Sequence, residues 1–424
     1  MRKVDHLIIG GGPAGLSLAY EFQQKGIDFL LIEKTDHIGG NAITYEWKDM
    51  LFDSGAHRVH GKIPRVTQRV KEILGDDLAL INKPSAIYSQ NQFFTFPFQA
   101  KEVIQKIGKR KTFKVALEQL APRSEGNSFQ SKVLHQYGPY LSQRFLLPYT
   151  EKLWGAPCDQ LMPEISGNRL SGVGVGSWLM EKLTGKSTHL EGKFYYPTKG
   201  IGMLFDEMQK AIPSDKIRLN STVDEFKWDS QQIKQVRLGE EWIEVGKVYS
   251  SIPSTIVSDM TVGPKVDLKF RHVRLLAVEV LTDEVTPFAS VYFSDGEVPF
   301  TRCVESKHRS SQMSPANKTV LVFEIPCYEG DEYFSLSEEA LFEKIKPYFP
   351  LFLPQNKIAD YTTKMIYNAY PVLSLNAKKE LVTVNNYLNQ FSNLQVIGRN
   401  GKFQYLHIHD LMDEAIGIAD KLQG

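Results

Sequence analysis

A glycine-rich loop joins an apolar run to a helix-like stretch at the start of the chain. The run Asp5–Gly10 is typical of a short buried strand, and Pro13–Lys25 is typical of a helix. Three glycines have the spacing G-x-G-x-x-G: Gly10, Gly12 and Gly15. The first permits a tight turn, the second lets the backbone approach a pyrophosphate, and the third lets helix and strand pack closely. The pattern predicts a Rossmann-type dinucleotide site with the phosphates at the helix N-terminus.

A second glycine pair follows the acidic end of the next apolar run. Phe29–Ile32 ends in Glu33, where a carboxylate can accept hydrogen bonds from ribose hydroxyls. After Lys34, the adjacent Gly39 and Gly40 bring backbone close to the cofactor again, where an ordinary NAD dehydrogenase would form a helix. Together the two motifs resemble the extended N-terminal signature of flavoproteins that include amine oxidases, protoporphyrinogen oxidases, carotenoid desaturases and UDP-galactopyranose mutases. The resemblance implies FAD rather than NAD.

Composition restricts the class of protein. The chain has 424 residues, 42% of them hydrophobic and 23% charged, which predicts a globular protein of two or three domains. The net charge of +1 gives no electrostatic case for nucleic acid or for an anionic membrane surface. No run reaches the roughly 18 apolar residues that a transmembrane helix needs. The three cysteines are widely spaced, so we expect reduced thiols, no metal site and a cytoplasmic location.

Helix-like and strand-like blocks alternate along the chain. They predict an α/β fold in which a Rossmann-type FAD-binding domain carries an inserted helical region and an antiparallel-sheet substrate domain. We assign the FAD-binding domain to residues 1–95, 190–262 and 388–424, the helical cap region to 96–189, and the sheet domain to 263–387. The nucleotide domain is therefore expected to be discontinuous.

Two histidines lie close together in the segment Gly55–His60. Their spacing alone could fit a metal pair, but no further ligands stand nearby in a recognisable spacing, and a structural histidine is the common alternative. The segment also resembles the G-A-H-x-x-H segment of UDP-galactopyranose mutases, which lies against the flavin ring. The resemblance implies that Gly55, Ala56 and His57 contact the flavin, with His57 near its N5 atom.

Three later segments resemble the same family in the same order. Pro148–Gly155 is similar to a Y-T-E-K-x-W-G motif of the active-site wall, and Val298–Arg302 is similar to V-P-Y-T-R, whose arginine contacts a substrate diphosphate. A guanidinium suits that contact because its planar fork can donate to two phosphate oxygens. Val396–Arg399 resembles the C-terminal element that returns to the flavin. On the residues alone, helix packing of the aromatic pair and a surface ion pair of Arg302 remain alternatives.

The resemblance assigns candidate roles residue by residue. The catalytic candidates are His57, Arg302 and Arg169, and the substrate-binding candidates are Tyr149, Trp154, Tyr370 and Tyr405. The candidate FAD-binding residues are Gly10, Gly12, Pro13, Ala14, Gly15, Glu33, Lys34, Gly39, Gly40, Asn41, Gly55, Ala56, His57, Val223, Gly398, Arg399, Asp410 and Leu411. Two positions depart from the mutases: Val173 replaces a second arginine, and His407 replaces an aspartate.

The resemblance implies a flavin-dependent UDP-hexose mutase of cell-surface polysaccharide synthesis. In that reaction N5 of reduced FAD attacks the anomeric carbon, UDP leaves, and the sugar recloses as a furanose without net redox. Arg302 and Arg169 would hold the diphosphate. Two alternatives remain open: an FAD-dependent oxidoreductase of the amine oxidase, protoporphyrinogen oxidase or desaturase type, and a flavoprotein that binds a sugar nucleotide without turnover. The expected partners are a nucleotide sugar, an electron donor (NAD(P)H or a reductase) and a second copy in a homodimer.

Overall fold

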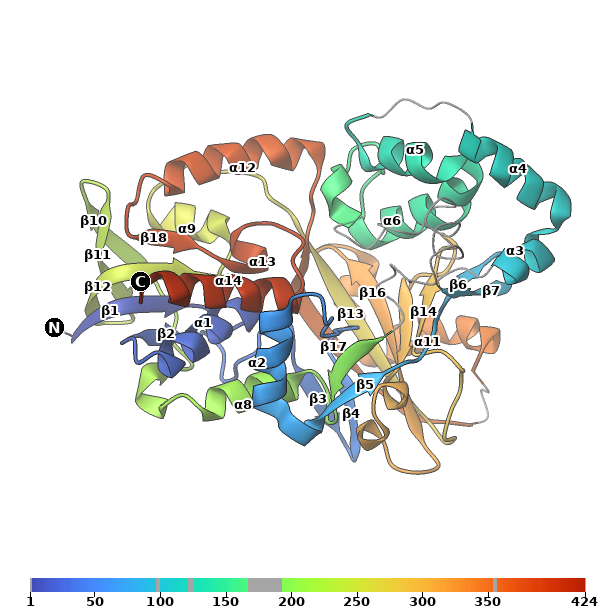
Figure 1. The fold of residues 1–424 in the computed structure, drawn as a ribbon, viewed down its shortest axis with the longest axis horizontal. Helices are drawn as coiled ribbons and strands as arrows, with labels where there is room; N and C mark the ends of the chain where they lie inside the picture. Colours follow the sequence, from blue (N-terminus) through green and yellow to red (C-terminus); the bar gives the residue numbers. More distant parts are fainter. Residues whose placement is uncertain (1, 97–99, 121–125, 167–192, 354–356, 424) are drawn as a thin grey trace.

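The computed structural model describes residues 2–96, 100–120, 126–166, 193–353 and 357–423, which form two large sheets surrounded by helices (Figure 1). The first sheet has the order β10-β11-β12-β1-β2-β9, and β18 also pairs with β12. Its strands are β1 (Arg2–Ile9), β2 (Leu30–Ile32), β9 (Ile217–Arg218), β10 (Glu225–Asp229), β11 (Gln232–Leu238), β12 (Glu241–Ser250) and β18 (Leu394–Val396). β18, β12, β1, β2 and β9 are parallel. Their carboxyl ends meet at one edge, where open α/β sheets bind ligands.

The two faces of this sheet pack against different helices. Successive strand residues point to opposite faces, so Ile8 joins one apolar cluster while Leu7 and Ile9 join another. The Ile8 cluster includes residues of α1 (Pro13–Gln24), α2 (Pro64–Leu74), α8 (Gly202–Lys210) and α14 (Ile408–Lys421). The Leu7 cluster includes residues of α9 (Ser254–Met260) and α12 (Leu375–Leu388). Helices therefore cover both faces, as in a Rossmann-type domain.

The second sheet has the order β17-β13-β16-β15-β14-β6-β7. Its strands are β6 (Ser85–Ser89), β7 (Gln92–Phe96), β13 (Phe270–Val280), β14 (Ser290–Phe293), β15 (Arg302–Glu305), β16 (Thr319–Cys327) and β17 (Ile358–Pro371). Neighbouring strands are antiparallel except β14 and β6, which are parallel, so the sheet is mixed. The helices α10 (Glu332–Ser335) and α11 (Glu338–Ile345) pack against its apolar residues.

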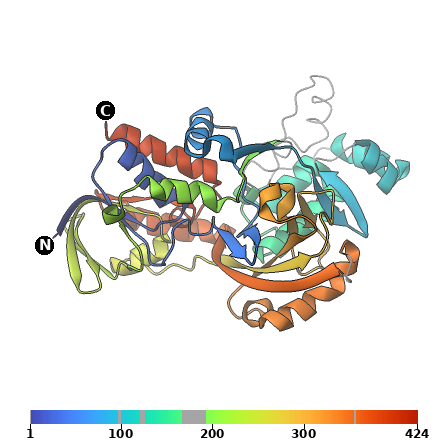
Figure 2. The ribbon, with the colours of Figure 1, turned by 90° about the horizontal axis from the view of Figure 1, so that it is seen from below.

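A group of helices lies beside the second sheet (Figures 1 and 2). It contains α3 (Ala100–Ile107), α4 (Lys109–Leu120), α5 (Phe129–Leu141), a π-helical turn (Ser142–Leu146) and α6 (Leu147–Trp154). α5 is kinked at Gly138, which has a φ of +77° and precedes Pro139. α6 ends at Gly155 in the left-handed conformation, which is the usual helix stop. The last turn of α6 carries Trp154.

The architecture is the predicted α/β fold, but two predicted boundaries need correction. The strands β6 and β7 lie before residue 96, yet they extend the second sheet because β6 pairs with β14. The helix α12 begins at Leu375, within the range assigned to the sheet domain, yet it packs on α9 against one face of the first sheet. Two short ribbons complete the fold: β3 (Thr44–Trp47) with β4 (Met50–Asp53), and β5 (Leu78–Ile81) with β8 (Phe194–Pro197). The short helix α13 (Gly398–Gly401) follows β18.

Candidate active site

The loop between β1 and α1 closes against the second glycine pair. Gly10 has a φ of +96°, and a Cβ on Gly15 would lie 2.0 Å from the Gly10 carbonyl oxygen, so both positions exclude side chains. Gly12 differs, because its φ of −70° suits any residue and its Cβ would meet only the Cα of Gly40, at 3.9 Å. Neither backbone conformation nor packing against the described residues requires a glycine there. The space beside Gly12 fits a cofactor phosphate, since the first turn of α1 has no side-chain cap and presents its N–H groups.

Glu33 lies at the carboxyl end of β2 and is buried. Its Oε2 accepts a hydrogen bond from the Gly11 N–H at 2.7 Å, and its Oε1 accepts from the N–H and Oγ1 of Thr35 at 2.9 and 2.8 Å. These bonds fix the carboxylate beside the loop, where a ribose would lie. The Ser221 N–H donates to the Glu33 carbonyl at 2.9 Å, which aligns the segment leading to Val223 with the same edge.

The C-terminal segment returns to the same loop. Gly398 has a φ of +77°, and a Cβ on it would lie 2.7 Å from the Cβ of Ala14 in the first turn of α1. The Gly398 N–H donates to Glu414 of α14 at 3.1 Å. Asp410, in the first turn of α14, accepts from the His407 N–H at 2.8 Å. The C-terminal element and the N-terminal turn of α1 are therefore in direct contact, although nearly the whole chain separates them.

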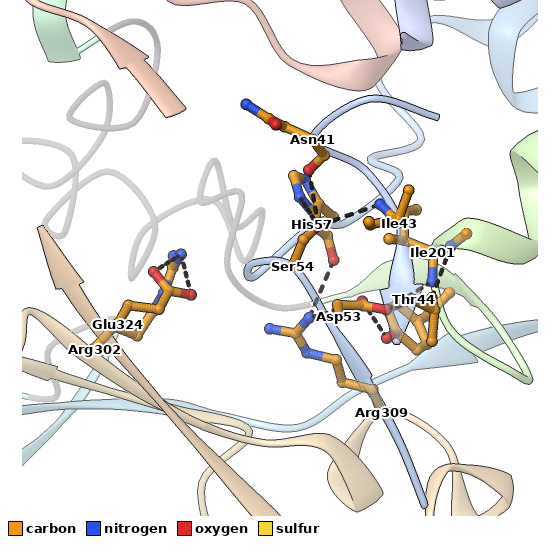
Figure 3. A network of polar contacts seen from close by, with 12 residues as sticks. Asn41, Ile43, Thr44, Asp53, Ser54, His57, Ile201, Arg302, Arg309 and Glu324 are labelled. Carbon is orange, nitrogen blue, oxygen red and sulfur yellow. Dashed lines mark hydrogen bonds and ion pairs between the residues drawn. The ribbon is translucent and has the colours of Figure 1, made fainter. Parts of the chain in front are cut away.

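A short loop after β4 carries His57 (Figure 3). The hydroxyl of Ser54 anchors the start of this loop by donating to the Asn41 carbonyl at 2.8 Å. The His57 N–H donates to the Gly55 carbonyl at 2.8 Å, which closes a tight turn. The Asn41 side chain donates in turn to the Tyr367 carbonyl of β17 at 2.8 Å. Asn41 thus joins the His57 loop to the second sheet.

Arg309, which no sequence pattern indicates, supports the His57 loop (Figure 3). Its side chain is 1% exposed, and its Nη1 lies 3.4 Å from the His57 carbonyl oxygen and 3.6 Å from Asp53 Oδ2. Burial raises the pKa of Asp53, and the Arg309 guanidinium opposes that rise. Arg309 also lines a cavity of about 10 Å³ with Gly55 and Glu324, which is room for about one water molecule. Arg309 therefore places a buried cation behind the loop.

Positive charge surrounds His57. Burial and then the guanidinium groups of Arg309, Arg399 and Arg302 lower the pKa of His57 to about 3. The imidazole is therefore neutral across the working pH range. It can orient a group by hydrogen bonding, but it holds no exchangeable positive charge near neutral pH.

The neutral His57 makes the protein less stable in acid. Its folded-state pKa lies below the unfolded value of about 6.5, so the unfolded chain binds the extra proton and stability falls as the pH drops below that value. We expect the wild-type protein to lose about 2 kcal/mol more unfolding free energy between pH 7 and pH 5 than His57→Asn does. Urea titrations of the FAD-free proteins at both pH values measure this difference. Parallel pH profiles would contradict the lowered pKa.

Arg302 and Glu324 form a buried ion pair across β15 and β16 (Figure 3). They are register partners, and Arg302 donates through Nε to Oε1 at 3.0 Å and through Nη2 to Oε2 at 2.5 Å. Burial alone would lower the pKa of Arg302, but the Glu324 carboxylate raises it well above its ordinary value. The guanidinium is thus fixed and charged. Because both side chains are buried, the surface ion pair is excluded.

Three of the four predicted substrate-binding residues form an aromatic cluster near this pair. The ring centre of Trp154 lies 5.7 Å from those of Tyr370 and Tyr405, and the two tyrosines stack at 6.2 Å. The Arg399 guanidinium lies 4.8 and 4.6 Å from the two tyrosine ring centres. Burial raises the pKa of Tyr370, and the nearby Arg302 charge opposes that rise. α6, β17 and the C-terminal segment therefore meet at one site.

The other predicted residues lie around this centre or beyond it. The Tyr149 ring packs edge-to-face on Tyr292 at 5.9 Å, and Tyr292 pairs with Arg302 in the sheet. Lys34 is exposed. Arg169 lies outside the described residues, as does position 173, so its role stays a prediction. Three more predicted residues lie in elements already described: Pro13 in α1, Ala56 in the His57 loop and Leu411 in α14.

Two residues of the site were not among the predictions. Glu324 is the single charged residue in β16, whose nine residues are all buried. An acid isolated in an apolar strand indicates a buried ion pair, so this signal was readable in the sequence. Arg309 lies in the turn after β15 and carries no such signal.

Comparisons with known proteins agree with this geometry. The family described as flavin containing amine oxidoreductase matches residues 13–371. The UDP-galactopyranose mutase of Mycoplasma pneumoniae is 21% identical, with 99% of this chain and 96% of that protein covered. A crystal structure of reduced UDP-galactopyranose mutase has a TM-score of 0.84 at 17% identity, covering 100% of this chain and 96% of that chain. The crystal structure of a putative protoporphyrinogen oxidase from Exiguobacterium has a TM-score of 0.77 at 14% identity, covering 100% of this chain and 99% of that chain. The chain therefore belongs to the flavin containing amine oxidoreductase family, and its cofactor is FAD.

Proposed function

We propose that this flavin-dependent enzyme is a sugar-nucleotide mutase that interconverts a UDP-hexopyranose, such as UDP-galactopyranose, and its furanose form. The observation that carries the proposal is the buried Arg302 beside the cluster of Trp154, Tyr370 and Tyr405. A fixed cation next to an aromatic wall suits a diphosphate joined to a sugar and a planar base. Similarity to a UDP-galactopyranose mutase over nearly the whole chain supports the same substrate class.

Arg302 is suited to a diphosphate by the way Glu324 holds it. The Glu324 carboxylate accepts hydrogen bonds from Nε and Nη2 of Arg302. The Nη1 atom of Arg302 makes no hydrogen bond within the described part of the chain. One guanidinium nitrogen is thus oriented for a ligand while the other two fix the side chain. Orientation that is established before binding lowers the entropic cost of forming the reactive complex. Arg399 supplies a second cation, 4.8 and 4.6 Å from the ring centres of Tyr370 and Tyr405.

The remaining residues position FAD under this proposal. Gly12 and Glu33 hold the pyrophosphate and ribose, and Gly398 brings the C-terminal element against the same loop. Reduced FAD, when bound, supplies the nucleophilic nitrogen that mutase chemistry requires. His57 would lie beside the flavin. Because its imidazole is neutral near pH 7, it would not act there as a general acid toward the substrate. An electron donor, NAD(P)H or a reductase, is needed to reduce the flavin first.

A net oxidoreductase is the second candidate, and His407 favours it. Its ring stacks on His409 at 5.3 Å and meets Tyr405 edge-to-face at 5.3 Å. A histidine here replaces the aspartate expected from the mutase resemblance, so the charge beside the aromatic cluster differs. The putative protoporphyrinogen oxidase also shares the fold over the full length of this chain.

Turnover under reducing conditions separates the candidates. We expect dithionite-reduced protein to convert UDP-galactopyranose to its furanose form, detected by anion-exchange chromatography, and we expect oxidised protein to be inactive. Peroxide formation from an amine or a porphyrinogen without added reductant would contradict the mutase and favour the oxidoreductase. A flavin spectral response to UDP-sugars with no product from a panel of them would favour a binding protein.

A further inference from the structure

The helix α4 carries an exposed face of mixed apolar and basic character. Phe113 is 67% exposed and Leu117 is 50% exposed, four residues apart and therefore on the same side of the helix. At 3.6 residues per turn, three exposed cations lie with them inside an arc of about 140°. They are Lys109, Arg110 and Lys114. The face thus has an apolar centre flanked by positive charge.

The opposite side of α4 fixes the helix to the protein. Val115 is buried, in a cluster that includes Phe94 and Phe145. The Glu118 carboxylate accepts from the Tyr140 N–H at 3.0 Å, which ties α4 to α5. Figure 2 shows α3 and α4 at the end of the molecule away from the N-terminus. The outer face of α4 is therefore turned away from the helices that α4 packs against, at a distance from the FAD-binding domain.

The positive charge of this face is not neutralised locally. None of Lys109, Arg110 and Lys114 forms an ion pair with another residue in the described ranges. The described acids of α3 and α4 are engaged elsewhere: Glu102 pairs with Lys106 at 2.6 Å, and Glu118 binds α5. The net charge of +1 for the whole chain therefore conceals a strongly basic patch.

We propose that the α4 face docks the protein on an anionic lipid surface. Phe113 and Leu117 would enter the boundary between headgroups and acyl chains, while Lys109, Arg110 and Lys114 contact lipid phosphates. No helix in the described ranges is long and apolar enough to cross a bilayer. A second copy of the same face would meet it with like charge, which opposes self-association. The phosphates of a nucleic acid could contact the cations of this face, but Phe113 and Leu117 would stay exposed to water.

Vesicle sedimentation tests the proposal on the FAD-loaded protein. We expect binding to phosphatidylcholine vesicles containing about one third phosphatidylglycerol and no binding to pure phosphatidylcholine vesicles, with binding lost as salt rises from about 0.05 M to about 0.5 M. The triple variant Lys109→Gln, Arg110→Gln, Lys114→Gln should bind about a hundredfold more weakly, since each cation contributes about fivefold. The double variant Phe113→Ser, Leu117→Ser should bind the anionic vesicles about tenfold more weakly than wild type.

A matched surface on α12 controls for nonspecific charge and hydrophobicity. Val382 is 55% exposed, and Lys378 and Lys379 are exposed on the same helix. The variant Val382→Ser, Lys378→Gln, Lys379→Gln should bind vesicles as wild type does. All variants should keep their flavin absorption, because these side chains are exposed and lie outside the active site. Equal binding by the α4 and α12 variants would overturn the proposal, as would wild-type protein that ignores anionic vesicles, binds single-stranded DNA instead, or dimerises through α4.

Discussion

Gly12→Val should give a folded protein that has lost its FAD. Gly12 has a φ of −70°, and a Cβ there would meet only the Cα of Gly40 at 3.9 Å, so the protein itself can accommodate a side chain. The added methyl groups instead fill the space over the first turn of α1 where the pyrophosphate must lie. We expect no visible flavin absorption in the purified variant, while its unfolding free energy without FAD stays within about 0.5 kcal/mol of the wild-type apoprotein.

Two further glycine variants control this experiment. Gly296→Val introduces the same side chain at a position without a positive φ, where a Cβ would meet no atom within 4 Å, so FAD should be retained. Gly15→Val should fail to fold, because its Cβ would lie 2.0 Å from the Gly10 carbonyl oxygen. A fully FAD-loaded Gly12→Val protein would refute the pyrophosphate assignment of this loop.

Arg302→Ala should destabilise the protein by about 3–5 kcal/mol as well as remove its response to nucleotide sugars. The cause is Glu324, whose carboxylate is 4% exposed and would remain buried without its partner. In the single variant, a lost response to nucleotide sugars therefore cannot be separated from the loss of stability. The double variant Arg302→Met, Glu324→Met removes both charges and should recover most of the stability. It should keep FAD but show no flavin difference spectrum when UDP is added.

A second buried carboxylate provides the matched control. Glu21 is 3% exposed and pairs with Arg69 at 2.8 Å, on α1 and α2. The double variant Glu21→Met, Arg69→Met makes the same chemical change away from the proposed substrate site. It should respond to UDP as wild type does. A normal UDP response in Arg302→Met, Glu324→Met would show that Arg302 does not contact the nucleotide.

The geometry of the glycine loop and of Glu33 was predictable because its determinants are local. Gly10, Gly12 and Gly15 lie within one β–loop–α unit, and Glu33 follows on the neighbouring strand. Each geometric requirement there, a tight turn, a close approach or a helix end, selects a residue type that the sequence displays. The candidates of the substrate side rested on the family resemblance, and the structure brings Trp154 and the two tyrosines of its cluster together.

The parts of the fold and the site that were not predicted depend on contacts between segments far apart in the sequence. β17 was not predicted, because Ile358–Pro371 lacks a clean alternation of buried and exposed residues and its pairing with β13 contains two register shifts. β6 and β7 were placed in the wrong domain because their partner β14 lies some two hundred residues later. Arg309 reaches the His57 loop across a similar distance in sequence. Such contacts leave no local pattern from which their partners can be read.

The proposed mutase would rearrange a nucleotide sugar without net redox, so a count of products per reducing equivalent tests the proposed function most directly. The flavin is photoreduced once, without oxygen and without excess reductant, and then mixed with UDP-galactopyranose. We predict many furanose products per flavin, with the absorption spectrum still that of reduced FAD at the end. Absence of furanose product while the flavin stays reduced would contradict the mutase, and an amine or a porphyrinogen that reduces the oxidised flavin would identify an oxidoreductase.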